Sequence, residues 1–192
     1  MNIKIIEEPF TKLATYATIP IAFEVASVYQ ELDSANGIVL NERVLPQTYI
    51  KDYDAMYGNH PTDLAKSFDL TNWSMLVAMV NVKWVGGAII AFSTPGVDML
   101  EGRDDLAVLW DIRVAPEFRG SGIGKSLFAA SEAWARSRGC SELKIETQNN
   151  NVPACKFYQS QGCELHSVNR GAYPELPDEI QLLWCKKIGN GE

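Results

Sequence analysis

This chain has few positively charged residues relative to its negatively charged ones. Its 192 residues include 17 lysines and arginines against 24 aspartates and glutamates, which gives a formal net charge of −7. Proteins that bind nucleic acid need a basic surface to neutralise the phosphates. We therefore expect no nucleic-acid partner, whereas the acidic balance is compatible with a cationic substrate.

Histidine and closely spaced cysteines are scarce as well. The chain has two histidines, His60 and His166, and four cysteines without a C-x-x-C spacing. Structural and catalytic zinc sites are built from clusters of these residue types, so the sequence predicts no metal site. We expect the cysteines to be free, reduced and partly buried.

Long apolar runs are absent too. No stretch of eighteen apolar residues occurs, and the first eight residues combine a short apolar run with acidic flanks. The first observation excludes a membrane-spanning helix, and the second is unlike a secretory signal. We therefore expect a cytoplasmic protein without a membrane partner, folded as one domain over residues 1–192 with a frayed tail at 189–192.

Glycine is concentrated in one informative stretch, Leu109–Lys125. The stretch predicts a strand that ends in Val-x-Pro, then a tight loop with Gly120, Gly122 and Gly124, and then the start of a helix. Alternate glycines let backbone N–H groups turn toward an anion without a Cβ in the way. The first turn of the helix aims unpaired N–H groups and the positive dipole end at the same point. The pattern predicts a pocket for a phosphate or pyrophosphate.

Three families of phosphate loop use this arrangement. A Walker A loop requires a glycine where Arg119 stands, and a dinucleotide fingerprint requires one where Lys125 stands. The pattern Arg-x-x-Gly-x-Gly, preceded by Val-x-Pro, fits without a gap and resembles the acetyl-CoA loop of the Gcn5-related N-acetyltransferases. A purely structural glycine turn and a divergent nucleotide loop are the alternatives for this segment alone.

A second motif of that family follows. Its members commonly carry Asn-x-x-Ala-x-x-Phe-Tyr-x-x-x-Gly, and here Asn151, Ala154, Phe157, Tyr158 and Gly162 fill those positions. Helical spacing places the alanine and both aromatic residues on one face. With two motifs at the family's spacing, the chain is identified as a member of the Gcn5-related N-acetyltransferases.

The resemblance implies an α/β fold. In this fold a mixed, mostly antiparallel central sheet is splayed at the acetyl-CoA site and flanked by helices. Residues 107–162 would form the acetyl-CoA-binding core, and about residues 1–73 would shape the acceptor side. The resemblance further implies acetyl-CoA as cosubstrate, no metal, and a monomer or homodimer.

The resemblance also implies the site residues. Acetyl-CoA would lie along the strand and loop and against the second motif, on residues Ile112, Arg113, Val114, Arg119, Gly120, Ser121, Gly122, Ile123, Gly124, Lys125, Ser126, Asn151, Ala154, Phe157 and Tyr158. A backbone N–H near Ile112 would stabilise the oxyanion. The amine would attack directly, without a cysteine nucleophile, and Tyr158 would protonate the leaving thiolate.

A general base is expected as well, because an alkyl ammonium must first lose a proton. At pH 7 that equilibrium costs roughly 4–5 kcal/mol. Asp111, on the strand that carries the thioester, and Glu146, at the end of the next strand, are the two candidates. Strict alternation places Asp111 on the same face as Arg113, so pairing with that arginine is its alternative role.

The last third of the chain resembles one subfamily, the streptothricin acetyltransferases. The residues that carry this resemblance are Ile145–Gln148, Ala172–Pro174, Asp178–Ile180 and Leu183–Trp184. They imply acetyl transfer to a primary amine of a small cationic acceptor, with streptothricin, an antibiotic, as the leading substrate. The alternatives are a protein or peptide N-acetyltransferase and a CoA-binding module without turnover.

Periodicity predicts the remaining elements. Residues 21–29 indicate a strand, with a helix as the alternative, 32–37 a turn, and 47–57 and 63–68 two short helices. Further strands are expected at 74–81, 83–92, 107–114, 141–147, 163–168 and 180–187, and helices at 124–138 and 152–161. Gly86-Gly87 inside one strand predicts a bulge or a close backbone approach. Residues 1–20 carry no clear pattern.

Overall fold

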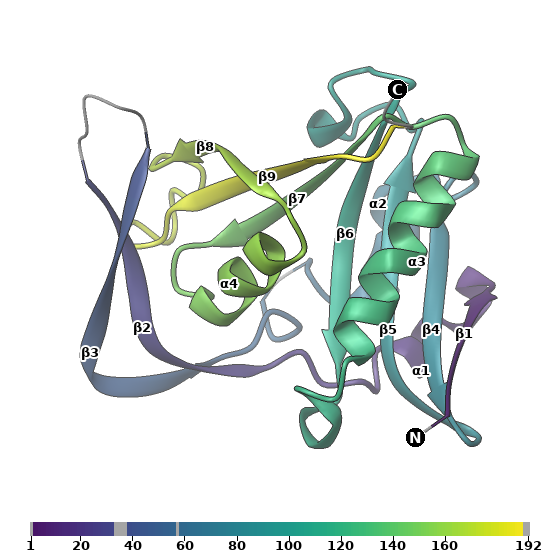
Figure 1. The fold of residues 1–192 in the computed structure, drawn as a ribbon, viewed down its shortest axis with the longest axis horizontal. Helices are drawn as coiled ribbons and strands as arrows, with labels where there is room; N and C mark the ends of the chain where they lie inside the picture. Colours follow the sequence, from purple (N-terminus) through teal and green to yellow (C-terminus); the bar gives the residue numbers. More distant parts are fainter. Residues whose placement is uncertain (1, 33–37, 57, 190–192) are drawn as a thin grey trace. The chain divides into compact units, whose positions relative to one another are not determined.

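The structure of the protein is a computed structural model that describes residues 2–32, 38–56 and 58–189 (Figure 1). The chain forms two compact units. The first consists of Met1–Ala22, Asp52–Leu143 and Lys187–Glu192, and the second of Phe23–Lys51 and Lys144–Lys186. The turn expected at 32–37 and residues 190–192 of the expected tail lie outside the described residues, except Leu32, which ends a strand.

The first unit is built on four antiparallel strands. Their order in the sheet is β1 (Ile3–Glu8), β4 (Ser74–Val80), β5 (Lys83–Phe92) and β6 (Leu106–Val114). The hairpin of β4 and β5 and the strand before the glycine loop confirm the prediction, whereas β1 lies in the unassigned segment. Strands β4 and β5 are buried along most of their length, and this explains their continuous apolar sequence.

Helix α3 (Ile123–Ser137) packs against β4, β5 and β6. It approaches β5 closely because residue 86 has no side chain. A Cβ at Gly86 would lie 2.9 Å from the Arg113 carbonyl oxygen and 3.1 Å from a methyl carbon of Leu127. Gly139, with φ of +83°, follows the helix and suits its C-terminal end.

Gly87, the next residue, lies on the opposite face of β5, because successive residues of a strand alternate between faces. A Cβ at Gly87 would lie 2.3 Å from Cε2 of Tyr16, in the short helix α1 (Leu13–Tyr16). The pairing of β4 with β5 also shifts between Ala78 and Met79. Both features predicted from the glycine pair, a bulge and a close approach, are therefore confirmed.

The core around α1 also includes α2 (Leu64–Ser67) and an aromatic cluster. The rings of Phe68, Trp73 and Trp110 lie 5.1–5.5 Å apart between centroids. Helix α2 and the 3₁₀ turn Pro61–Asp63 before it confirm the helix expected at 63–68. His60 caps that turn.

The second unit contains a long antiparallel hairpin, β2 (Phe23–Leu32) with β3 (Val39–Lys51). It also contains α4 (Val152–Ser160) and most of β7 (Glu142–Gln148), β8 (Glu164–Asn169) and β9 (Gln181–Lys187), in the sheet order β7-β9-β8. The Asn151 side chain caps α4 by accepting a hydrogen bond from the Ala154 N–H at 3.2 Å, and Pro153 lies in the first turn. Strands β2, β7, β8 and β9 and both long helices confirm the sequence-based expectations.

The helix expected at 47–57 is wrong: its first five residues belong to β3, and residues 52–56 form turns and bends without a helix. Their partners lie on β2, where Val25 pairs with Tyr49 and Phe23 with Lys51. The stretch Thr48-Tyr49-Ile50 consists of a β-branched, an aromatic and a β-branched residue, which suit a strand. Pairing with a distant segment outweighed the local helical spacing.

All four cysteines are free, as expected, and three of them are buried. The two units together have the α/β fold expected, with mostly antiparallel strands and flanking helices. None of the helices in the described part of the chain is long and apolar enough to cross a membrane.

Candidate functional site

The glycine loop, residues 115–122, connects β6 to α3 in the first unit. A 3₁₀ turn at Pro116–Phe118 starts it, and Gly120 and Gly122 then adopt φ of +77° and +89°. Such values are unfavourable for residues with a side chain. A Cβ at either glycine would meet nothing within 4 Å, so the two glycines leave open space above the backbone.

The first turn of α3 completes this loop. The N–H of Ser126 donates to the Gly122 carbonyl at 3.0 Å, which is the first hydrogen bond of the helix ladder. The N–H groups of Ile123, Gly124 and Lys125 precede it and have no acceptor within the helix. Together with the positive end of the helix dipole they form a cradle for an anion. These residues fit a pyrophosphate.

Arg119 and the two serines of this region hold the loop in place. The Arg119 guanidinium donates to the carbonyl oxygens of Val114 at 3.0 Å and Ala22 at 2.9 Å, and its N–H donates to Pro116. Ser121 donates to the Phe118 carbonyl at 2.5 Å, and Ser126 to Gly122 at 3.2 Å. Their side chains therefore bind the protein's own backbone.

Arg113, on β6 beside the partly buried Ile112 and Val114, is the centre of a buried ionic network. Its guanidinium lies 2.7 Å from Asp54 and 2.6 Å from Asp111, and its side chain is 1% exposed. Burial favours loss of its proton, but the two carboxylates outweigh burial and raise its pKa. The pairing of Arg113 with Asp111 expected from strand alternation is confirmed.

Asp111 accepts hydrogen bonds from Tyr16 as well as from Arg113. The Tyr16 hydroxyl donates to its Oδ1 at 2.5 Å, and Arg113 Nε donates to the same oxygen at 2.9 Å. Burial and the neighbouring carboxylate raise the pKa of Tyr16 well above its usual value. The sequence does not reveal Tyr16 as a site residue, because it is 95 residues from its partner and lies in a segment without periodicity.

Glu146 lies in the second unit, on β7. Its Oε1 accepts a hydrogen bond from the Tyr173 hydroxyl at 2.5 Å, and its Oε2 accepts one from Gln181 at 2.9 Å. Gln148, two residues further along β7, donates to the same tyrosine hydroxyl at 3.2 Å. Tyr173 thus fixes the carboxylate relative to the C-terminal loop, residues 170–180.

Tyr158 is on α4 in the same unit and is 5% exposed. Its ring lies 5.4 Å from that of Phe157, and both Phe157 and Ala154 are partly buried. On the same helix, burial raises the pKa of the Cys155 thiol to about 11. That thiol is protonated at neutral pH, which does not suit a nucleophile.

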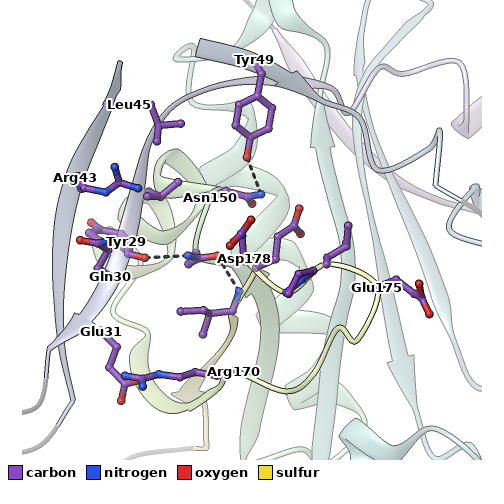
Figure 2. Close-up of a pocket in the computed structure, with 16 residues that line it drawn as sticks. Tyr29, Gln30, Glu31, Arg43, Leu45, Tyr49, Asn150, Arg170, Glu175 and Asp178 are labelled. Atoms are coloured by element: carbon purple, nitrogen blue, oxygen red, sulfur yellow. Dashed lines mark hydrogen bonds and ion pairs between the residues drawn. The ribbon is translucent and has the colours of Figure 1, made fainter. Parts of the chain in front are cut away.

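The second unit also contains a pocket of about 760 Å³, shown in Figure 2. We call it the hairpin pocket; the β2–β3 hairpin, Asn149 and Asn150 after β7, and the C-terminal loop line it. Asn149 joins these walls: its side chain donates to the Tyr29 carbonyl at 3.0 Å and accepts from the Ile180 N–H at 2.9 Å. The sequence does not reveal this role of Asn149, because its partners lie 120 and 31 residues away.

Two solved structures share the fold over almost the whole chain. Nourseothricin acetyltransferase has a TM-score of 0.77 at 20% identity, covering 98% of this chain and 99% of its own. A putative streptothricin acetyltransferase from Bacillus anthracis, solved with acetyl coenzyme A, has a TM-score of 0.76 at 24% identity, covering 97% and 99%. At such identities the likeness concerns the fold.

Sequence relatives match shorter stretches. Streptothricin acetyltransferase from Escherichia coli is 36% identical over 84 residues, which are 42% of this chain and 48% of that protein. Streptothricin acetyltransferase A from Bacillus subtilis is 32% identical over 84 residues, or 43% and 49%. The chain thus spans about half the length of these two curated relatives. The model of the Acetyltransferase (GNAT) family matches residues 44–163, more than half of the chain and both sequence motifs. The chain therefore belongs to the acetyltransferase (GNAT) family.

Proposed function

We propose that the protein transfers an acetyl group from acetyl-CoA to a primary amine of a small cationic acceptor. The observation that carries this proposal is the glycine loop with the first turn of α3, where open backbone and unpaired helical N–H groups suit a pyrophosphate. Family membership supports the reaction class. The names of the streptothricin acetyltransferases among the relatives support streptothricin as the leading acceptor.

In this proposal, bound acetyl-CoA supplies an activated thioester, and the protein positions it. The backbone of Gly120, Gly122, Gly124 and Lys125 holds the pyrophosphate, and the edge of β6 at Ile112–Val114 holds the pantetheine. A backbone N–H near Ile112 stabilises the oxyanion that forms on the carbonyl oxygen. We also propose Asn151, Ala154 and Phe157, in the second unit, as acetyl-CoA-binding residues.

We propose Tyr158 as the general acid, since the departing thiolate needs a proton donor. The amine nitrogen forms a bond to the carbonyl carbon, the carbon–sulfur bond breaks, and the departing sulfur takes the proton of the Tyr158 hydroxyl. A tyrosine near pKa 10 that protonates a thiolate near 8.5 makes an uphill transfer of about 2 kcal/mol. Such a step is compatible with general acid catalysis.

For the base we favour Glu146 over Asp111. Both Asp111 oxygens accept from Arg113, so a proton on Asp111 would disrupt a buried ion pair. In the described part of the chain, Glu146 accepts hydrogen bonds only from the neutral Tyr173 and Gln181. Its remaining lone pairs suit a proton taken from the amine, directly or through water.

The test is acetyl transfer to a panel of amines that includes streptothricin, an aminoglycoside, spermidine and a lysine peptide. Thiol release and the mass of the acceptor are measured in parallel. Acetylated streptothricin is the expected product. Transfer to the lysine peptide alone would replace the proposal by the protein N-acetyltransferase, and CoA binding without any transfer would replace it by a non-catalytic CoA-binding module.

A further inference from the structure

We infer that the hairpin pocket binds a protonated ammonium group of the acceptor, with Glu179 and Asn150 as its anchoring residues. This inference rests on the proposed function, whose acceptor it specifies. The ammonium in the pocket is distinct from the amine that reacts, because an anchored group keeps its proton whereas the attacking amine must lose one.

Two residues that line the pocket, each with a buried acceptor atom that lacks a partner, carry the inference. Asn150 is 2% exposed; its Nδ2 donates to the Tyr49 hydroxyl at 3.3 Å (Figure 2), while its Oδ1 has no hydrogen-bond partner among the described residues. Glu179 accepts from the Lys51 ammonium through Oε1, and its buried Oε2 also has no partner in the described part of the chain. Buried polar atoms without partners are uncommon in folded proteins. Both atoms are acceptors, so the missing partner is a donor.

An ammonium group matches this requirement. It presents three N–H donors and no acceptor, so one group supplies donors to more than one acceptor. A phosphate or a carboxylate offers acceptors only, and would place negative charge beside Glu179. An apolar ligand would leave both orphaned atoms unsatisfied.

The charge of the pocket favours the same ligand. Four carboxylates and two guanidiniums line it: those of Glu31, Glu175, Asp178, Glu179, Arg43 and Arg170. Arg170 pairs with Glu31 at 3.0 Å, and Glu179 pairs with Lys51. Among the described residues, the charges left without an ion pair are Glu175 and Asp178 on the loop wall and Arg43 on the hairpin wall (Figure 2). Acid is in excess.

The pocket is also joined to the candidate base. The loop that supplies one wall also contains Tyr173, whose hydroxyl donates to Glu146 at 2.5 Å, and Asn149 ties the same loop to β2 and β7. An acceptor held in this pocket is therefore held on the framework that orients Glu146. Binding of the anchored ammonium therefore helps to place the reacting amine in the correct position.

Binding of spermidine, a triamine, and of butylamine, a monoamine, tests the inference by calorimetric titration of the full chain. We expect spermidine to bind at least about tenfold more tightly than butylamine. Glu179→Gln should weaken spermidine binding about tenfold because it removes the anchoring anion, and Asn150→Leu about threefold because it removes a neutral acceptor at similar volume. Glu164→Gln, at an exposed residue of β8, is the control for net charge and should bind spermidine like the wild type.

Spermidine affinity that is unchanged in both pocket variants, or lowered equally by Glu164→Gln, would overturn the inference. Circular dichroism checks each variant, and Asn150→Leu decides the matter if Glu179→Gln does not fold. The acetyl-transfer assay separates the two proposals. Acetylated amines with KM values unchanged in the pocket variants would overturn this inference alone, whereas anchored spermidine without transfer to any amine would overturn the proposed function alone.

Discussion

At the scale of single residues, Gly122 is the position where adding a side chain should have the clearest effect. Its φ of +89° costs a residue with a Cβ about 1–2 kcal/mol, and a valine would fill the open space above the loop. We expect Gly122→Val to lower the affinity for CoA by about 10²-fold or more, since both the shape and the donors of the cradle change. Calorimetric titration with CoA measures this.

Gly96→Val is the matched control for Gly122→Val. Gly96 has φ of +82° and equally open surroundings, but it lies in the loop after β5, away from the glycine loop in sequence. It should show similar backbone strain and normal CoA affinity. Equal CoA affinity in the two folded variants would place the cofactor elsewhere.

Substitution of Tyr158 should affect the chemical step more than the binding of acetyl-CoA. We expect Tyr158→Phe to lower kcat by about 10²–10⁴-fold, the usual contribution of a positioned acid. The KM for acetyl-CoA should change little, because the ring and its contact with Phe157 remain. Steady-state kinetics measure both constants, and a loss of kcat below about threefold would leave Tyr158 as a packing residue only.

The two candidate bases should fail in different ways. Glu146→Gln should lower kcat/KM near pH 7 and shift the rising limb of the pH–rate profile to higher pH, because the amine must then lose its proton without help. Asp111→Asn should instead lower the free energy of unfolding by about 2 kcal/mol or more, because it weakens the buried network of Arg113 and Tyr16.

Urea unfolding and a pH series on both variants distinguish these effects. A normal pH profile for Glu146→Gln, together with a shifted one for Asp111→Asn, would reverse the assignment.

At the scale of elements, local features are predictable from the sequence and distant ones are not. The glycine loop and helix α3 follow from residues adjacent in the chain, and so does the Asn151 cap. Strand β3 does not, because its partner β2 decides its conformation. The hairpin pocket brings together Tyr29, Asn150 and Glu179, and no spacing in the sequence signals that they meet.

The contact of α1 with β5 is an element-scale feature that one methyl group should disrupt. Gly87→Ala would place a Cβ 2.3 Å from the buried Tyr16 ring, so α1 or the strand has to move. We expect a loss of about 2–3 kcal/mol in the free energy of unfolding, as in other overpacked cores. Gly171→Ala is the control, because its nearest neighbour lies at 3.7 Å. Equal stability of the two variants in urea unfolding would contradict the close packing of α1.

At the scale of the whole molecule, the net charge of −7 acts on both substrates and with opposite sign. A polycationic acceptor would be attracted to an acidic protein, whereas acetyl-CoA carries phosphates and, in the site proposed above, depends on the short-range donors of the glycine loop to overcome the repulsion. Charges in solution are screened over about 10 Å at 0.1 M salt. Added salt therefore weakens the attraction of one substrate and the repulsion of the other.

We expect the KM for streptothricin to rise about three- to tenfold when salt is raised from about 0.05 to 0.5 M. The KM for acetyl-CoA should stay constant or fall. A monoamine acceptor is the control, and its KM should respond less, because fewer of its charges are attracted. Initial-rate kinetics at fixed pH measure all three. Salt responses of the same sign and size for both substrates would mean that a general effect on the enzyme, and not the charge of the acceptor, governs binding. In that case the acidic balance would say nothing about the acceptor, and the hairpin pocket would have to recognise it by short-range hydrogen bonds alone.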